Sequence, residues 1–387
     1  MKIAFIDYVL DPTKPGRSGL SDMVWDMASE LVHQGHEIHV IASYHTTEYP
    51  DSRVTVHNFK TPPIGYRNII GQLWLLARAA RIVRTLKPDV VHAPEYVSTA
   101  VMTALRVPCP VVLTVPGNIF YRLSQNDGTT YDWSLLIVLK WAARQSARQC
   151  ARVIAISTDM KKWWQWTGSR PENTPVIPLG VNPERFFPLP DTRSKLNLPD
   201  QPLLLLYVGR FALEKGLYDV LDAVKTVHDS TPDLARTLQL KLIGRGPIED
   251  ELKRRCEALG LGDIVEIRSW VPQDELTSWY SAADALILAS SAEGFSRTIP
   301  EAMSCGTPVI GSAISGTEDH VKEGVNGYLF PYGDKAQLSE ILRRVTERPE
   351  LLRGLRATTE QYARDYLQWP GITRRIVRDV YMPATSL

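Results

Sequence analysis

Two glutamates, Glu293 and Glu301, stand eight positions apart in the stretch EGFSRTIPE. The apolar run before them, residues 284–289, predicts a strand that ends in a loop of small residues. Proline is tolerated in the first turn of a helix, so Pro300 predicts a helix start, with Glu301 in its first turn and Glu293 in the loop. At such a place two carboxylates can accept hydrogen bonds from sugar hydroxyls, beside backbone amides that suit hydroxyl oxygens or an anion. In the alternative interpretation, Glu301 only interacts with the helix dipole and Glu293 is an ordinary loop charge.

Two cations, Arg210 and Lys215, lie in the segment GRFALEKG, directly after the apolar run at residues 203–208. That order places both of them just beyond the carboxyl end of a predicted strand. A planar guanidinium and a mobile ammonium can together neutralise a diphosphate without a metal ion. A surface ion pair between Arg210 and Glu214 is the alternative for the guanidinium.

A glycine-containing loop, PGRSG at residues 15–19, follows the first apolar run of the chain. Gly16 and Gly19 permit a phosphate or a sugar to approach the backbone closely, but an ordinary turn is the simpler interpretation of this loop. The chain contains neither G-x-G-x-x-G nor G-x-x-x-x-G-K-[ST]. It also lacks an Asp-x-Asp motif and a Cys-x-x-Cys pair, so we predict a site with no metal and no cofactor.

Short apolar runs alternate with longer amphipathic segments along the whole chain. This alternation predicts mainly parallel sheets that are covered by helices on both faces. The proline-rich residues 183–201 interrupt it, so we expect them to link two doubly wound, Rossmann-like α/β domains. The domains are expected at residues 1–182 and 202–364, facing each other across a cleft, with a helical tail at 365–387 that packs back on the first domain. The expected strands are residues 3–5, 37–42, 90–92, 110–115 and 153–156 in the first domain and 203–209, 241–244, 264–267, 285–288 and 308–311 in the second.

The composition of the chain excludes several classes of protein. The 44 Lys and Arg residues balance 43 Asp and Glu, which gives no case for a nucleic-acid partner. No run approaches the ~18 apolar residues of a membrane span, and the N-terminus resembles a buried strand rather than a secretion signal. We therefore expect a cytoplasmic protein that rests at most on an anionic membrane surface. The candidate contacts for that surface, which a solvated helix face would also explain, are Arg78, Arg81, Arg84, Lys140, Arg144, Arg148 and the segment KKWWQW at 161–166.

Taken together, these segments resemble family 4 of the GT-B glycosyltransferases over nearly the whole chain. The most specific part is residues 293–308, where the two glutamates lead into EAMSCGTPVI. The resemblance implies a retaining transfer of a sugar from a nucleotide-sugar donor to a glycan, lipid-linked or small-molecule acceptor, as in cell-surface polysaccharide or glycoconjugate synthesis. Other matching stretches are VIPLGVNPERF at 176–186, LIGRGP at 242–247 and SGTEDHVKEGVNGYLF at 315–330.

The resemblance also implies roles for individual residues. Arg210 and Lys215 would hold the diphosphate, Glu293 would contact the donor sugar and Glu301 the nucleotide ribose. We expect Glu293, Arg210 and Lys215 to be catalytic. The further donor-side residues would be Gly16, Gly19, Gly209, Gly244, Arg245, Val271, Gly294, Phe295 and Ser296, with backbone amides of the last three facing sugar hydroxyls.

The first domain departs from the family pattern at Pro116, where many members carry a histidine, and at Leu179, where an asparagine is common. Proline has neither ring nitrogens nor a backbone donor to offer a sugar. His92, at the end of the preceding strand, is an alternative candidate for the acceptor side, although a histidine that caps a strand end is the simpler interpretation. The expected acceptor-side residues are His92, Pro116, Gly117 and Asn118.

Three other functions remain open from the sequence. A sugar-nucleotide epimerase of the same fold would need acid–base residues and no acceptor, and a non-catalytic module would bind a nucleotide sugar without turnover. A nicotinamide-linked oxidoreductase is disfavoured because no glycine fingerprint follows a strand. Recognition of the base is expected from backbone near Arg245 and residues 270–272, so UDP, GDP and ADP sugars are all candidate donors.

Overall fold

A computed structural model describes residues 1–7, 19–42, 51–58, 69–114, 133–199, 202–230, 237–269 and 271–386 of the chain. It divides into two compact units. The first combines Met1–Gly180 with Trp369–Leu387, and the second is Val181–Gln368. Each unit is described here by itself.

The first unit contains a parallel sheet in the order β3-β2-β1-β4-β5-β6. Its strands are short and apolar, and the side chains of β2, β4 and β5 are almost all buried, as expected for a sheet that is covered on both faces. The strands are β1 (Lys2–Asp7), β2 (Glu37–Ala42), β3 (Thr55–Asn58), β4 (Val90–Ala93), β5 (Val111–Thr114) and β6 (Arg152–Ile154).

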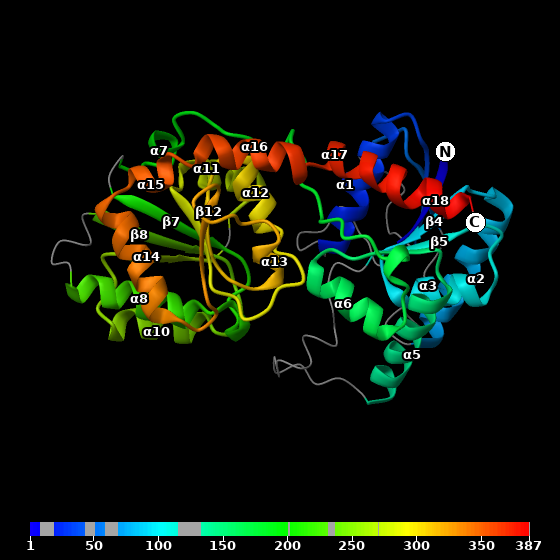
Figure 1. Cartoon of the computed structure of the whole chain (residues 1–387), viewed down its shortest axis with the longest axis horizontal. Helices are drawn as coiled ribbons and strands as arrows, with labels where there is room; N and C mark the ends of the chain where they lie inside the picture. The colour runs from blue at the N-terminus through cyan, green and yellow to red at the C-terminus, as the bar shows by residue number, and fades with distance from the viewer. Residues whose placement is uncertain are drawn as a thin grey trace. The chain divides into compact units, whose positions relative to one another are not determined.

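Helices cover both faces of this sheet (Figure 1). Helices α2, α3 and α5 pack side by side on one face, whereas α1 and the C-terminal α17 pack together on the other. The helices are α1 (Gly19–His33), α2 (Ile69–Leu86), α3 (Tyr96–Ala104), α5 (Trp133–Gln149), α6 (Thr158–Thr167), the 3₁₀ turn η1 (Pro171–Asn173), α17 (Trp369–Ile376), the π-helical turn η3 (Val377–Tyr381) and α18 (Met382–Thr385).

The C-terminal segment belongs to the first unit because large side chains anchor it there. Trp369 is buried, and its indole Nε1 donates to Asp26 Oδ2 at 3.3 Å. A side chain at Gly180 would collide with the Trp369 ring, since a Cβ there would lie 2.4 Å from Cδ2. Tyr381 is fully buried near Met27 of α1.

The second unit repeats the same design, with a parallel sheet in the order β12-β11-β10-β7-β8-β9. The prediction of two doubly wound α/β sheets is therefore confirmed in the described part of the chain. Its apolar strands form the centre of a large buried core. The strands are β7 (Leu203–Val208), β8 (Leu238–Ile243), β9 (Val265–Arg268), β10 (Ala285–Leu288), β11 (Val309–Ser312) and β12 (Gly327–Phe330).

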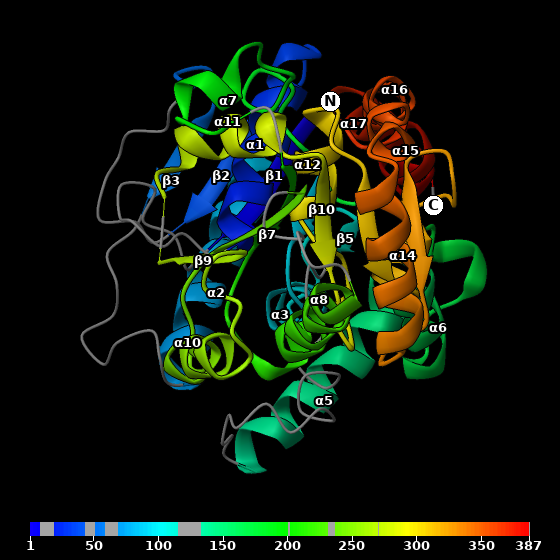
Figure 2. The same cartoon turned by 90° about the vertical axis from the view of Figure 1, so that its left-hand side faces the viewer.

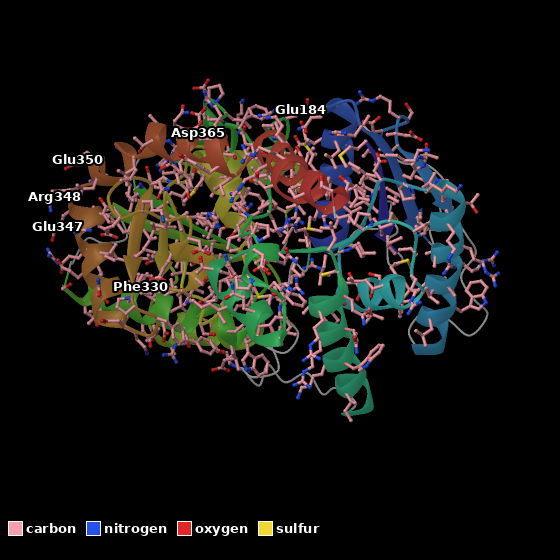
Figure 3. The ribbon with its side chains drawn as sticks, turned by 45° about the vertical axis from the view of Figure 1, so that its right-hand side comes forward. Glu184, Phe330, Glu347, Arg348, Glu350 and Asp365 are labelled. Atoms are coloured by element: carbon pink, nitrogen blue, oxygen red, sulfur yellow. The ribbon has the colours of Figure 1, made fainter. Side chains whose placement is uncertain are left out.

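Helices α8, α10 and α14 pack on one face of the second sheet, and α11, α12 and α16 on the other (Figure 2). The turn between α14 and α15 carries exposed Glu347, Arg348 and Glu350 at the surface (Figure 3). The helices are α7 (Thr192–Lys195), the 3₁₀ turn η2 (Leu213–Lys215), α8 (Leu217–Ser230), α10 (Glu249–Ala258), α11 (Gln273–Ala282), α12 (Thr298–Ser304), α13 (Ser315–Glu318), α14 (Lys335–Glu347), α15 (Glu350–Arg353) and α16 (Arg356–Tyr366).

The strand order of the second sheet fixes where a ligand can bind. The first strand of the unit, β7, lies between β8 and β10, so the chain leaves β7 toward one edge and later returns to its other side. In open α/β sheets, ligands bind beyond the carboxyl ends of the strands at this reversal. The loops that follow β7 and β10 therefore meet at the expected binding position.

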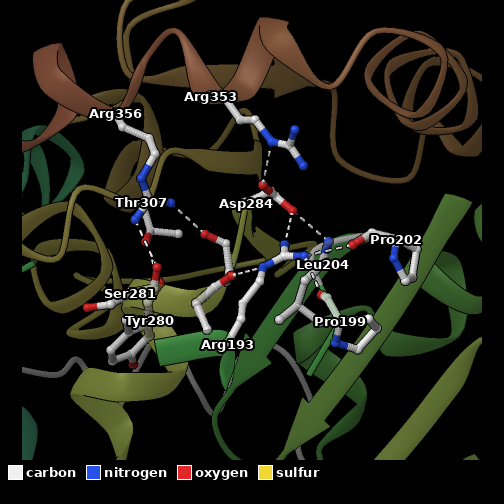
Figure 4. A network of polar contacts seen from close by, with 12 residues as sticks. Arg193, Pro199, Pro202, Leu204, Tyr280, Ser281, Asp284, Thr307, Arg353 and Arg356 are labelled. Carbon is white, nitrogen blue, oxygen red and sulfur yellow. Dashed lines mark hydrogen bonds and ion pairs between the residues drawn. The ribbon is translucent and has the colours of Figure 1, made fainter. Parts of the chain in front are cut away.

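The expected linker, residues 183–201, is part of the second unit rather than a free connection. Phe186 is buried and packs edge-on against Tyr280, at 6.0 Å between the ring centroids. Arg193 donates from Nη2 to Asp284 Oδ2 at 2.5 Å and from Nε to the Ala282 carbonyl at 3.1 Å (Figure 4). The prolines were interpreted as spacers, but the aromatic and guanidinium side chains between them anchor the segment to the core.

Candidate functional site

The loop after β7 carries Arg210 and is held from beneath by Tyr207. Tyr207 is the last residue but one of β7, and its hydroxyl donates to the Arg210 carbonyl at 2.8 Å. Tyr207 is 1% exposed, and burial, followed by the nearby Glu293 carboxylate, raises its pKa far above the ordinary value. Its hydroxyl therefore stays protonated and can donate. The guanidinium of Arg210 forms an ion pair with Glu214.

Lys215 ends the 3₁₀ turn η2 and reaches the loop after β10. Its Nζ forms an ion pair with Oε1 of Glu293, and both side chains are largely buried, with 20% and 13% exposed. Gly216 follows with a φ of +65°, and a Cβ there would lie 2.0 Å from the Ala289 carbonyl. Only glycine allows this close approach, which brings the β7 loop against the end of β10.

The loop after β10 positions Glu293 through backbone and hydroxyl contacts. Ser290 donates from Oγ to Glu293 Oε1 at 3.1 Å, and the Ser291 amide donates to the Glu214 carbonyl at 2.9 Å. Gly316 packs so closely beneath that a Cβ would lie 2.6 Å from the Glu293 carbonyl. The two loops are thus joined at two points, by a side-chain ion pair and by a backbone hydrogen bond.

The residues that follow Glu293 belong to the same loop after β10. Gly294 is half-buried, and Phe295 is buried with its ring edge-on to His320 at 5.2 Å between centroids. Burial lowers the pKa of His320 to about 4, so this imidazole is neutral at pH 7. Ser296 Oγ lies 2.9 Å from Thr298 Oγ1.

Glu301 lies in the first turn of α12, as predicted, and is 9% exposed. Its Oε2 accepts a hydrogen bond of 2.8 Å from the hydroxyl of Tyr280, which is fully buried in α11. Burial raises the pKa of Tyr280 well above its ordinary value, and the Glu301 charge adds to that shift. The hydroxyl is thus a permanent donor that orients the carboxylate.

The loop after β8 forms the neighbouring wall. A Cβ at Gly244 would lie 1.8 Å from the Gly209 carbonyl, and one at Gly246 would lie 2.0 Å from the Phe211 carbonyl. The Phe211 amide donates to the Arg245 carbonyl at 2.9 Å. Glycine is required here because the two loops touch through their backbones. Of the residues expected near the base, Arg245 is exposed and Val271 is buried.

The expected residues of the first unit have a different outcome. Gly16, Pro116, Gly117 and Asn118 lie outside the described residues, and Gly19 is the first residue of α1. His92 is described, and the structure contradicts its expected contact with an acceptor.

His92 is 0% exposed, and both of its ring nitrogens already have protein partners. Nδ1 lies 2.6 Å from the Tyr381 hydroxyl and Nε2 lies 2.8 Å from Thr114 Oγ1. Complete burial lowers its pKa to about 3, so the ring is a neutral bridge between the sheet and the C-terminal segment. The side chain has neither the exposure nor an unused nitrogen for a substrate.

Sequence reasoning did not identify Tyr207, Tyr280 or Ser290 as parts of the site. Tyr207 stands three residues before Arg210, and Ser290 three before Glu293, so proximity to the motifs was the only available signal. Tyr280 lies 21 residues before Glu301, within a helix that has no local mark of function. Among the described residues, no group of three or more His, Cys, Asp or Glu is placed to hold a metal ion.

Two family models match the chain, one for each half. Residues 190–365 match a model described as glycosyl transferases group 1, and residues 17–185 match one described as glycosyltransferase family 4. A D-inositol 3-phosphate glycosyltransferase of Catenulispora acidiphila is 33% identical over 203 residues, which cover 51% of this chain and 49% of the relative. The chain thus spans about half the length of such curated relatives. An uncharacterized glycosyltransferase of Methanocaldococcus jannaschii is 27% identical. The matched region covers 86% of this chain and 85% of that relative.

Solved structures agree on the fold. A sucrose-phosphate synthase of Thermosynechococcus elongatus superposes with a TM-score of 0.77 at 23% identity, over 97% of both chains. Anabaena HepE in complex with UDP gives a TM-score of 0.77 at 21% identity, over 99% of this chain and 100% of that one. The fold is therefore GT-B.

Proposed function

The chain belongs to family 4 of the group 1 glycosyltransferases, and from that premise we propose that it moves a sugar from a nucleoside-diphosphate sugar to an acceptor hydroxyl, with retention at the anomeric carbon. The observation that carries the proposal is the meeting of Arg210, Lys215 and Glu293 where the β7 and β10 loops join. At the point where the strand order reverses, the cations suit the diphosphate of a nucleotide sugar and the carboxylate suits its sugar hydroxyls.

The chemistry assigns a separate task to each charge. The bond from the anomeric carbon to the diphosphate oxygen breaks while the acceptor oxygen forms its bond to that carbon. Negative charge develops on the leaving diphosphate, where Arg210 and Lys215 stabilise it, and a leaving-phosphate oxygen takes the acceptor's proton. Glu293 accepts hydrogen bonds from the sugar, together with the amides of residues 294–296, and Glu301 holds the ribose. The charges suffice without a metal ion, so we expect activity in the presence of EDTA.

UDP sugars are our first choice of donor, since HepE of the same fold is described in complexes with UDP and with UDP-glucose. The names of other relatives direct attention to hydroxyl-rich acceptors, namely D-inositol 3-phosphate and the lipopolysaccharide outer core. We therefore propose a sugar-containing acceptor, free or lipid-linked, in glycoconjugate synthesis. The four cysteines are all unpaired thiols, which fits a reducing cytoplasm.

The donor class can be tested with UDP-, GDP- and ADP-glucose and the corresponding nucleoside diphosphates. We expect one diphosphate to raise the melting temperature, because a ligand at ~100 times its Kd stabilises by about 2.7 kcal/mol. The matching donor should then release that diphosphate slowly to water and faster with a suitable acceptor, in EDTA. Melting temperatures unchanged by all three series would contradict the proposal. Interconversion of the donor sugar without release would instead identify an epimerase, and binding without turnover a binding protein.

We also propose that the first unit rests on the inner face of an anionic membrane. Helices α2 and α5 expose cations and large apolar side chains together, and they contain no acidic residue. Trp141 and Ile137 of α5 are 52% and 66% exposed beside an apolar hollow of about 460 Å³ that Leu73 of α2 also lines. Basic and tryptophan-bearing helix surfaces bind the headgroup region of anionic bilayers. No helix in the described part of the chain is long and apolar enough to cross a bilayer.

Co-sedimentation with vesicles tests this surface. The protein should pellet with vesicles that contain phosphatidylglycerol and remain in the supernatant with pure phosphatidylcholine. Reversal of two charges in α5, Lys140→Glu with Arg144→Glu, should abolish pelleting, since each basic residue contributes about 1 kcal/mol at such a surface. Reversal of Lys253 and Arg254, which pair with carboxylates in α10, is the matched control and should change nothing. Equal pelleting of both double variants would refute the proposed surface.

A further inference from the structure

Both cations of the β7 loop already have a carboxylate partner within the protein. Lys215 pairs with Glu293, and Arg210 pairs with Glu214. Two positive and two negative charges together leave no net charge to attract a diphosphate. A diphosphate can enter strongly only if at least one cation changes its partner.

Arg210 is the more exposed of the two cations, at 45% against 20%, but Lys215 is the one paired with the carboxylate assigned to the donor sugar. Its ammonium is a point charge on a flexible stem of four carbons. Glu293 is held more firmly, by Ser290 Oγ at 3.1 Å and by the close packing of Gly316 against its carbonyl. If Lys215 moves, the carboxylate of Glu293 stays at its place and loses its charged partner.

We propose that donor binding is an exchange of ion pairs, in which the diphosphate takes Lys215 from Glu293 and a hydroxyl of the donor sugar then donates to the released carboxylate. This inference rests on the proposed function of the site. It makes Glu293 a residue that discriminates between donor and product, because the nucleoside diphosphate alone removes Lys215 but brings no hydroxyl to replace it. The product should therefore bind less tightly than its contacts with Arg210 and Lys215 would otherwise allow.

Glu214 provides the comparison, because it is a carboxylate in the same site with a different position. Its carbonyl accepts a hydrogen bond of 2.9 Å from the Ser291 amide, and its side chain pairs with Arg210 rather than with Lys215. Loss of its charge should help a free diphosphate and a sugar diphosphate equally. Loss of the Glu293 charge should help only the free diphosphate, since the sugar hydroxyl then donates to a neutral amide oxygen, a weaker acceptor than the carboxylate.

The experiment measures Kd by calorimetry for whichever of UDP, GDP and ADP binds best, and for its glucose derivative. Glu293→Gln should bind the free diphosphate about tenfold more tightly, as expected for the loss of a part-exposed competing ion pair, while its Kd for the sugar form does not fall. Glu214→Gln should tighten both ligands by the same factor. Glu249→Gln, which removes a carboxylate from a surface pair in α10, is the control and should leave both constants unchanged.

A double-mutant cycle separates the exchange from the general effect of removing a negative charge. In a Lys215→Ala background, Glu293→Gln should give no tightening, because no ammonium is left to release. A tenfold gain that persists without Lys215, or equal gains for both ligands in Glu293→Gln, would overturn the inference. Failure of all three nucleoside diphosphates to bind the unaltered protein would refute the proposed function, and the exchange with it. Melting temperatures of all variants show that they are folded.

Discussion

Replacement of Lys215 by alanine should lower the rate of donor cleavage by about 10²- to 10³-fold. The ammonium stabilises charge that appears on the leaving diphosphate only as the bond breaks, and loss of one such preorganised donor costs that much in kcat. The measurement is release of nucleoside diphosphate from saturating donor, with a fixed acceptor and in the presence of EDTA.

Lys225→Ala is the matched control for this prediction. Lys225 lies in α8 of the same unit and pairs with exposed Asp229, so its removal deletes an equivalent ion pair outside the site. We expect its turnover to stay within about twofold of the unaltered protein, as for most surface pairs. Near-normal turnover of Lys215→Ala would remove Lys215 from the catalytic machinery.

Replacement of Arg193 by leucine should destabilise the second unit by about 3–5 kcal/mol. Asp284 is 7% exposed, and its Oδ2 accepts both from Arg193 Nη2 at 2.5 Å and from the Leu204 amide at 2.8 Å (Figure 4). Without the guanidinium the carboxylate remains buried beside a more distant Arg353, at 3.4 Å from Oδ1. The cost of removing one partner of a buried pair is of this order. Urea denaturation, with hydrogen exchange of the β7 amides as the local probe, measures it.

Arg364→Leu is the matched control, since its ion pair with Glu360 lies on the exposed face of α16. We expect a change of no more than about 0.5 kcal/mol in the free energy of unfolding. The double variant Arg193→Leu with Asp284→Asn should recover part of the loss, because the buried charge is gone. A change below 1 kcal/mol in Arg193→Leu would show that the segment 183–201 is a loose linker after all.

The positions of the charged loop residues were predictable because each follows an apolar strand in the sequence. Arg210 and Lys215 follow one apolar strand and Glu293 follows another, and parallel strands present their carboxyl ends at the same edge. The sequence could not show that β7 and β10 are neighbours, since 76 residues lie between Val208 at the end of β7 and Ala285 at the start of β10, and only the sheet order joins them. The ion pair between Lys215 and Glu293 was therefore beyond sequence reasoning.

Other errors have equally specific causes. Strand β3 was not predicted because its residues TVHN form no apolar run, and β12 was not predicted because its short run GYLF begins with glycine, which weakens a strand. The proline spacing of residues 183–201 suggested a linker, yet stability there depends on contacts made by Phe186 and Arg193 with residues about 90 positions away. His92 lies next to the end of its strand, β4, but its partner Tyr381 comes from the other end of the chain.

A structure of the protein with the best-binding nucleoside diphosphate is the most direct test of the proposed donor site. We predict that the diphosphate contacts Arg210 and Lys215, that the ribose hydroxyls meet Glu301, and that Lys215 has left Glu293. A diphosphate bound in the first unit, or one that leaves Arg210 and Lys215 with their carboxylates, would contradict the assignment of these residues to the reaction.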